Sequence, residues 1–326
     1  MARKLKSVGA SLGTAGSLAA AAGVAAATAL WVQLRARKAE RDNPPAGRFV
    51  DVDGVRLHYM EKGEGPTIVL LHGNMVFLQD FIGSGLFDRL AKRHRVIAFD
   101  RPGFGHSGRP RGRLWSAQAQ AALLHQALGK INVKEPVVVG HSWGTLVALA
   151  LAIKFPSFVG GLVLISGYYY PTARLDVALS APAAIPLLGD ALRYTVSPLM
   201  GRLMLKRTVE AMFAPAQMPE DFFRVMSREM MLRPIQIRAE AQDAAFMITA
   251  AASFRQHYSN LTVPMSIFAG AGDKVVDVES QSARLHRTVP HSTLTVSHGA
   301  GHMVHYALAD EIVDAISLMS NRACVS

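Results

Sequence analysis

Short apolar runs alternate with longer helical stretches along most of the chain. The runs, nearly continuous in Val, Ile and Leu, cover Thr67–Leu71, Arg95–Phe99, Pro136–Val139, Leu162–Ile165, Val263–Ala269 and Thr293–Val296. Such runs are typical of strands that are buried on both faces of a parallel sheet. Helical stretches over Asp80–Lys92, Ser116–Lys130 and Thr145–Phe155 are long enough to connect parallel strands. This order predicts an α/β fold with a mostly parallel central sheet and helices on both faces.

The residues before the first apolar run follow a different pattern. From Phe49 to Met60, apolar and polar residues alternate around Asp53-Gly54, a pair suited to the positive φ angles of a tight turn. We therefore expect the folded domain to begin near Arg48 with two antiparallel strands.

The alternation of strands and helices stops between two of the apolar runs. Residues 172–261 are rich in Pro, Ala and Met and lack a buried-strand pattern, so we expect an inserted helical cap there, with a core formed by residues 48–171 and 262–326. Flexible methionine thioethers suit an adaptable apolar pocket, although packing between cap helices is the simpler explanation for any single one. Eight of the fourteen methionines lie in the cap: Met200, Met204, Met212, Met218, Met226, Met230, Met231 and Met247.

Residues 1–47 form a separate N-terminal segment. No charged side chain occurs from Ser7 to Leu34, and a helix of that length would span about 42 Å, more than the hydrocarbon core of a bilayer. Trp31 lies near one end, and basic residues flank both ends, so the orientation stays open. We expect a membrane anchor, followed by an extended linker over Glu40–Gly47.

Two other interpretations of this segment stay open. It consists mainly of Ala and Gly, which partition weakly into lipid, and the small residues from Ala25 to Ala29 fit a signal-peptidase site. Cleavage there would give an exported soluble protein. The third interpretation is a soluble helix.

The net charge of +11 does not indicate a nucleic-acid partner. The first 47 residues hold seven basic and two acidic residues, nearly half of the excess, and the rest has no basic cluster interleaved with aromatics. Cys324 is the only cysteine, which excludes an intramolecular disulfide and a thiolate metal site. The oligomeric state is left open by the sequence.

The strongest local motif is Gly140-His141-Ser142-Trp143-Gly144, which follows the apolar run Pro136–Val139 and precedes a helix. This is a G-x-S-x-G turn in a strand-turn-helix setting, in which the serine hydroxyl projects alone. Bulky side chains two residues before or after the serine would clash in so tight a turn. Ser142 is therefore the candidate nucleophile, and the N-terminus of the following helix favours negative charge beside it.

A serine hydroxyl needs a base and an orienting acid from elsewhere in the chain. His302 follows the last predicted strand in Gly299-Ala300-Gly301-His302, and His298 and His305 are the nearby alternatives. Asp273 follows the preceding strand in Gly270-Ala271-Gly272-Asp273, with Asp277 and Asp176 as weaker alternatives. We therefore assign His302 as the base and Asp273 as the acid, in the chain order Ser, Asp, His.

The reaction also needs two donors for an oxyanion. His72-Gly73-Asn74 follows the strand Thr67–Leu71, so we expect the backbone N–H groups of Asn74 and Trp143 to form the oxyanion hole. The His72 side chain is expected to brace loops by hydrogen bonds. In the loop from Asp100 to Ser107, Asp100 is expected to be structural.

Together these stretches resemble the α/β-hydrolase superfamily over about residues 48–320, in particular its capped serine esterases, cofactor-free haloperoxidase-like enzymes and carbon-carbon bond hydrolases. In that superfamily, epoxide hydrolases and haloalkane dehalogenases carry aspartate at the elbow, where this chain has Ser142. Lipases often have an extended glycine run in the oxyanion loop, where this chain has Asn74 and Met75 after Gly73. The resemblance therefore implies acyl transfer to serine and does not favour a large lipid substrate.

The expected function is a serine hydrolase that cleaves a carboxylic ester or related acyl bond of a small hydrophobic substrate through an acyl-enzyme, without metal or organic cofactor. A haloperoxidase-like enzyme or a carbon-carbon bond hydrolase with the same triad is the alternative within enzymes. A ligand-binding member of the same fold, which keeps the triad to capture a small molecule, is the alternative outside them.

Overall fold

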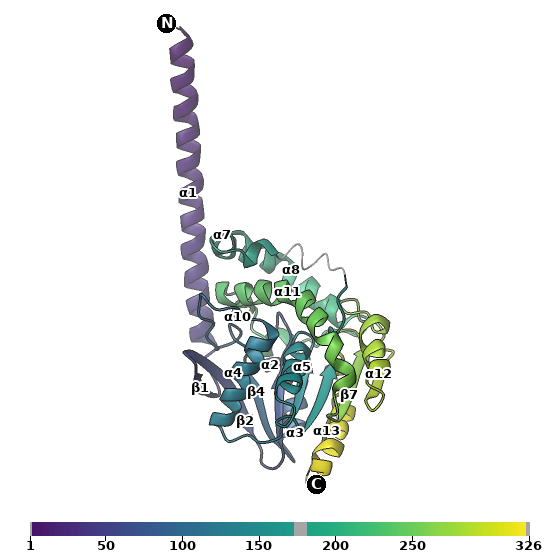
Figure 1. Cartoon of the computed structure of the whole chain (residues 1–326). Helices are drawn as coiled ribbons and strands as arrows, with labels where there is room; N and C mark the ends of the chain where they lie inside the picture. The colour runs from purple at the N-terminus through teal and green to yellow at the C-terminus, as the bar shows by residue number, and fades with distance from the viewer. Residues whose placement is uncertain (1, 173–180, 324–326) are drawn as a thin grey trace.

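The computed structural model describes residues 2–172 and 181–323, and an eight-stranded sheet forms its centre (Figure 1). The strands are β1 (Arg48–Val52), β2 (Val55–Lys62), β3 (Thr67–Leu71), β4 (Arg95–Phe99), β5 (Val137–His141), β6 (Gly161–Ile165), β7 (Met265–Gly270) and β8 (Thr293–Ser297). Their order in the sheet is β1-β2-β4-β3-β5-β6-β7-β8. β2 is antiparallel to β1 and β4, and all other pairs are parallel. The predicted α/β fold is confirmed.

Helices cover both faces of the sheet, because successive strand residues point to opposite sides. Val69 and Leu71 of β3 pack in one cluster with α4 (Ala117–Lys130) and α5 (Gly144–Lys154). Ile68 and Leu70 pack in a second cluster with α2 (Gln79–Gly83), α3 (Leu86–Leu90) and α13 (Ala309–Ala323). The core also contains the π-helical η3 (Glu279–Ala283), α12 (Arg284–Thr288) and the 3-10 helix η4 (Val304–Tyr306). Both clusters leave the carboxyl edge of the parallel strands free for a site.

Two local predictions have different outcomes. The turn between β1 and β2 has positive φ at Asp53 and Gly54, as expected for the antiparallel hairpin. The single helix predicted over Asp80–Lys92 is wrong, because α2 and α3 are separated at Ser84 and Gly85. Gly85 has φ +76°, which breaks the helical path and lets the second short helix turn its apolar side to the sheet.

The helices that follow β6 and precede β7 in the chain lie over the carboxyl edge of the sheet (Figure 1). They are the 3-10 helix η1 (Ala181–Ala184), α7 (Leu188–Tyr194), α8 (Val196–Phe213), α9 (Phe222–Val225), α10 (Arg228–Met231) and α11 (Pro234–Phe254), followed by the 3-10 helix η2 (Arg255–Asn260). We call α7 to α11 the cap helices. The division into a core and a cap at residues 172 and 261 remains a proposal, and Asp176 and Cys324 lie outside the described residues.

The N-terminal segment forms one long helix, α1 (Ala2–Asp42), which rises beside the cap (Figure 1). The extended linker expected over Glu40–Gly47 is therefore wrong in its first part, and the chain leaves the helix only just before Pro44. Glu40 pairs with the buried Arg233 at 2.8 Å, and Ala39 packs in the same cluster as cap residues. These contacts stabilise the helix past the point where a free spacer would begin.

One buried ion cluster joins the cap to the core. Asp243 of α11 is fully buried and receives hydrogen bonds from Arg101 at 2.5 Å and from Arg109 at 2.9 Å. Gln120 of α4 donates to the same carboxylate at 3.1 Å. The free energy of desolvating these charges is offset only while every charge keeps its partner.

We expect Asp243→Asn to destabilise the protein strongly, because it leaves Arg101 and Arg109 buried with one charge too few. Removing one partner of a buried pair typically costs about 3–5 kcal/mol, which lowers Tm by roughly 10 °C in a protein of this size. Thermal unfolding of both proteins measures this difference. Glu279→Gln is the control, since the exposed Glu279–Arg287 pair contributes little, and equal Tm values for the two variants would contradict the expectation.

Candidate active site

Ser142 occupies the turn between β5 and α5 with a φ of +51°, a conformation that non-glycine residues seldom adopt. The surrounding glycines explain how this turn fits. A Cβ on Gly140 would lie 2.7 Å from Thr145, and one on Gly144 would lie 2.2 Å from the Leu71 carbonyl oxygen. The turn therefore presses directly on β3, and only hydrogen atoms fit at these two positions.

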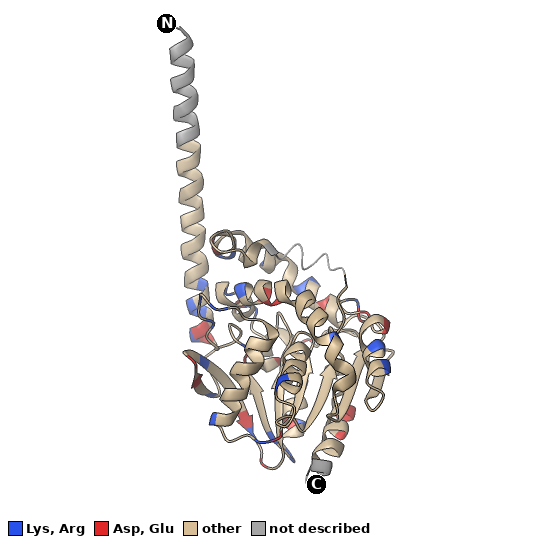
Figure 2. Ribbon diagram, viewed as in Figure 1, with Lys and Arg blue, Asp and Glu red and all other residues tan. Residues whose placement is uncertain are grey.

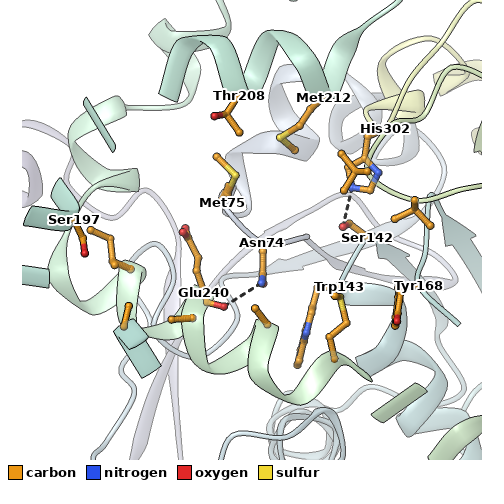
Figure 3. Close-up of a pocket in the computed structure, with 17 residues that line it drawn as sticks. Asn74, Met75, Ser142, Trp143, Tyr168, Ser197, Thr208, Met212, Glu240 and His302 are labelled. Atoms are coloured by element: carbon orange, nitrogen blue, oxygen red, sulfur yellow. Dashed lines mark hydrogen bonds between the residues drawn. The ribbon is translucent and has the colours of Figure 1, made fainter. Parts of the chain in front are cut away.

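The structure brings Ser142, His302 and Asp273 together. His302 Nε2 lies 2.8 Å from Ser142 Oγ, and His302 Nδ1 lies 2.8 Å from Asp273 Oδ2 (Figure 3). The imidazole and the carboxylate are both almost fully buried. This chain of hydrogen bonds is the geometry in which a histidine removes the serine proton while an acid holds its tautomer.

Asp273 is fixed in place by its own loop. Its Oδ1 accepts hydrogen bonds from the backbone N–H groups of Val275 and Val276 at 2.8 and 2.9 Å. The other oxygen is then left to face His302. Since the loop supplies these donors, the carboxylate keeps its direction toward His302.

The alternative residues lie elsewhere. His298 is exposed, and His305 is buried against Asp80, with His305 Nε2 3.0 Å from Asp80 Oδ2. Asp277 is exposed and accepts a hydrogen bond from the Ser280 backbone N–H at 2.8 Å, as a helix cap does. Their positions separate them from the Ser142 hydroxyl.

The proposed oxyanion donors lie on two sides of Ser142. A Cβ on Gly73 would be 2.9 Å from Ser142 Cβ, so the loop after β3 lies too close to the serine for any side chain at position 73. No hydrogen bond to another described residue uses the backbone N–H of Asn74 or of Trp143. The Asn74 side chain is engaged, because its amide donates to the Glu240 carbonyl at 3.4 Å (Figure 3).

Arg101 holds this loop, and the sequence interpretation missed it. Its guanidinium donates to the carbonyls of His72 and Gly73 at 2.8 and 3.0 Å and to the Asn74 side chain at 2.8 Å. It lies against the Trp143 ring at 4.5 Å. The arginine therefore connects both sides of the proposed oxyanion hole. The only sequence signal was its place in the rigid loop after β4.

His72 and Asp100 have the bracing roles expected of them. Burial and, to a smaller extent, the neighbouring Arg101 charge lower the pKa of His72 to about 3, so the ring is neutral. Its Nδ1 donates to the Gly73 carbonyl at 2.7 Å, and its Nε2 accepts from the Arg101 backbone N–H at 2.9 Å. Asp100 accepts from the backbone N–H groups of Leu78 and His106.

A second buried cluster lies behind the catalytic candidates. Asp80, His141 and His305 place possible metal-ligand atoms within 4.8 Å of one another. Tyr306 donates to Asp80 Oδ1 at 3.0 Å, and His141 Nε2 lies 3.2 Å from the His302 carbonyl. Burial and the neighbouring imidazoles hold the pKa of His141 well below its ordinary value. A neutral His141 can therefore support the His302 backbone by donating a hydrogen bond to it.

A cavity of about 510 Å³ opens in front of Ser142 (Figure 3). Met75, Met212, Met247 and Tyr168 contribute to its largely apolar wall, with Glu240 as the acidic residue. Of the eight cap methionines, Met212 and Met247 line this cavity, whereas Met226 and Met230 are buried in the packing between helices. Some cap methionines thus line the pocket, and others pack between helices.

Known proteins resemble both the sequence and the fold. The chain is 26% identical over 266 residues to the 2-hydroxy-6-oxo-2,4-heptadienoate hydrolase of Pseudomonas putida, covering 80% of this chain and 91% of that protein. It superposes on a thermophilic esterase from Thermogutta terrifontis with a TM-score of 0.68 and 23% identity, covering 85% and 99% of the two chains. A membrane phospholipase A described as a bacterial virulence factor superposes with a TM-score of 0.66 and 22% identity, covering 98% and 100%.

The two structural similarities concern the fold, because their sequence identities are low. The family model described as the alpha/beta hydrolase fold matches residues 66–307, which include Ser142, Asp273 and His302. This match spans most of the chain and agrees with the parallel sheet and with the resemblance expected from the sequence. The chain belongs to the α/β-hydrolase fold family.

Proposed function

We propose that the protein is a serine hydrolase that cleaves a carboxylic ester or related acyl bond of a small hydrophobic substrate. The observation that carries this proposal is the hydrogen-bonded chain from Ser142 through His302 to Asp273 at the wall of an apolar cavity. An aspartate at the elbow would favour alkyl transfer to a carboxylate instead, and this chain has serine there.

The reaction proceeds through an acyl-enzyme. His302 takes the hydroxyl proton as Ser142 Oγ attacks the carbonyl carbon, and the backbone N–H groups of Asn74 and Trp143 stabilise the oxyanion. His302 then gives this proton to the leaving alcohol as the tetrahedral intermediate collapses. Water, activated by the same histidine, attacks the acyl-enzyme and releases the acid. The side chains of the chain itself supply every proton transfer.

We expect Ser142→Ala to lower kcat/KM for p-nitrophenyl esters by at least about 10⁴-fold, because it removes the nucleophile and leaves the rest of the site. A chain-length series from acetate to dodecanoate also defines the acyl pocket. Ser317→Ala on α13, at the far end of the fold, is the matched control and should behave like the wild type. An inert wild type, correctly folded, would sink the esterase proposal.

A carbon-carbon bond hydrolase is the second candidate, favoured by the likeness to the Pseudomonas putida hydrolase over most of both chains. The same serine, histidine and acid would serve it. Turnover of a vinylogous diketone, measured beside the ester series, distinguishes the two candidates by their relative kcat/KM values.

Glu240 of α11 sets the charge of the cavity. Its carboxyl points into the cavity (Figure 3), and Gln236 donates to Oε1 at 3.2 Å. Burial raises the pKa of Glu240 to about 8, which outweighs the opposing effect of Arg101. The carboxyl is therefore mostly protonated at neutral pH. An uncharged wall of this kind accepts a neutral, apolar acyl group.

We expect KM for neutral esters to rise severalfold as the pH rises through about 8, because Glu240 then ionises beside an apolar substrate. Glu240→Gln, which cannot ionise, should keep KM constant over pH 6–9.5. Initial rates across this range measure both curves, with Ser142→Ala as the blank for spontaneous hydrolysis. Identical pH profiles for wild type and Glu240→Gln would show that another group is responsible.

We propose that α1 remains attached as a membrane anchor. Among the described residues, Gly16–Asp42 is the only helical stretch long and apolar enough to cross a bilayer, and the same length and composition would fit a signal sequence. Its last turns are docked to the cap through Arg35, which pairs with Glu229 at 2.9 Å, and through Glu40. These contacts favour a helix that stays with the domain.

We expect the protein isolated from its host to be found in the membrane fraction with Ser7 to Leu34 still present, because the anchor is retained. Intact mass spectrometry after detergent extraction measures this. Removal of residues 2–26 should move the protein to the soluble fraction. A mature N-terminus within residues 26–30 would instead establish cleavage.

A further inference from the structure

Exposed apolar side chains are concentrated on the outer face of two cap helices. Outside α1, nearly all large apolar residues that the described chain exposes lie between Ile185 and Met204, the exceptions being Leu114 and Leu318. Leu187 and Leu203 are 83% and 75% exposed. We define the cap apolar face by Ile185, Leu187, Leu188, Val196, Leu199 and Leu203. Exposed apolar side chains that gather on neighbouring elements, as here on α7, α8 and the segment before them, mark an interaction site.

Charge is nearly absent from this face. Between residues 181 and 203 the charged residues are Asp190, Arg193 and Arg202. Asp190 pairs with Arg193 and, at 2.9 Å, with Arg111, and Arg202 pairs with Glu229. The exposed Lys206 and Arg207 follow on α8, at the border of the face. Arg193 is buried. Figure 2 shows α7 and the middle part of α1 mainly in tan, with charged residues of both signs at the foot of α1. An apolar surface whose own charges are paired suits a hydrocarbon environment.

The height of this face relative to α1 matches the end of a membrane span. The charge-free run begins at Ser7, and about 20 helical residues cross a hydrocarbon core of about 30 Å, which reaches Ala26. Side chains of α1 begin to be covered at Thr28 and Ala29, and Val32 is buried. The remaining charge-free residues up to Leu34 therefore lie beside the cap, where α1 contacts α7.

A second cavity adjoins the one in front of Ser142 and lies next to this face. Met204 of α8 is 56% exposed and lines a cavity of about 200 Å³, whose wall shares Met75 and Thr208 with the cavity in front of Ser142. The two cavities thus adjoin beneath α8. Met204, next to Leu203 in the chain, therefore connects the border of the cap apolar face to the wall of these cavities.

We propose that the cap apolar face rests on the bilayer that holds α1, so that esters partitioned in the membrane enter the active-site cavity along α8. This inference rests on the proposed anchor and, for the entry of substrate, on the proposed esterase activity. A second copy of the chain is the other possible occupant of such a face. The continuity of the apolar surface with α1 at the end of its span favours lipid.

Depth-dependent quenching tests the contact without requiring turnover. Cys324→Ser gives a cysteine-free full-length chain, into which single cysteines are placed at Leu203, at Leu318 on α13 as the matched exposed control, and at Val24 on α1 as the inserted reference. Each is labelled with a polarity-sensitive fluorophore and reconstituted in phosphatidylcholine vesicles containing nitroxide-labelled acyl chains. We expect the labels at positions 203 and 24 to be quenched at least twofold more than that at 318.

Equal quenching at positions 203 and 318 would overturn the proposal. Energy transfer between position-203 labels that persists on dilution of the protein in lipid, without nitroxide quenching, would overturn it in favour of a second copy. Both outcomes are independent of catalysis, so a failure of the esterase proposal is recognised separately by the absence of turnover on soluble esters.

Activity tests the entry route. We expect Leu199→Glu and Leu203→Glu to lower hydrolysis of a medium-chain fluorogenic ester partitioned into vesicles about tenfold, because each charge resists contact with lipid. Hydrolysis of soluble p-nitrophenyl acetate should stay at the wild-type level, since neither side chain lines the cavities. Leu318→Glu is the control for added charge. Equal losses on both substrates, or no loss on the partitioned ester, would contradict entry from the membrane.

Discussion

The close approach between the turn at Ser142 and strand β3 is the constraint on which the site depends. Gly144 presses against the Leu71 carbonyl and Gly73 against Ser142 Cβ, so the serine, the loop after β3 and the start of α5 occupy one tightly packed volume. The positive φ of Ser142 is tolerated because the parallel pairing of β5 with β3 and β6 fixes the strand that enters the turn, and Gly144 at its exit lies against the Leu71 carbonyl. Asp273 and His302 then need only follow β7 and β8 to arrive at the same edge.

The cap contacts this core through buried charges as well as through apolar side chains. Arg101 connects the loop after β3 to Trp143 and to Asp243 on α11, and the Trp143 indole N–H donates to the Asp243 carbonyl at 2.9 Å. A displacement of α11 would therefore move the proposed oxyanion donors. This arrangement couples the shape of the substrate cavity to the geometry at the reacting carbonyl.

The sequence was sufficient for the sheet and for the meeting of Ser142, His302 and Asp273, because strand periodicity and the position of a residue after its strand are local properties. It was insufficient where contacts with residues distant in the sequence determine the local conformation. The break at Gly85 and the helical conformation of Glu40 depend on packing against the sheet and on Arg233, and the buried ion cluster of Asp243 depends on a cap whose position no local pattern records. Oxyanion roles for Asn74 and Trp143 stay predictions.

The docking of α1 has a mechanical consequence. The helix α1 is continuous to Asp42. Its last turns are joined to the cap by the buried Val32 and Ala39 and by the Glu40–Arg233 pair, so a change in the tilt of α1 also changes the tilt of the cap. A helix whose apolar length exceeds the local hydrocarbon thickness tilts to compensate. With α1 as the proposed membrane anchor, the inclination of the cap would follow bilayer thickness. A thin membrane and a thick one would present the same protein at different angles.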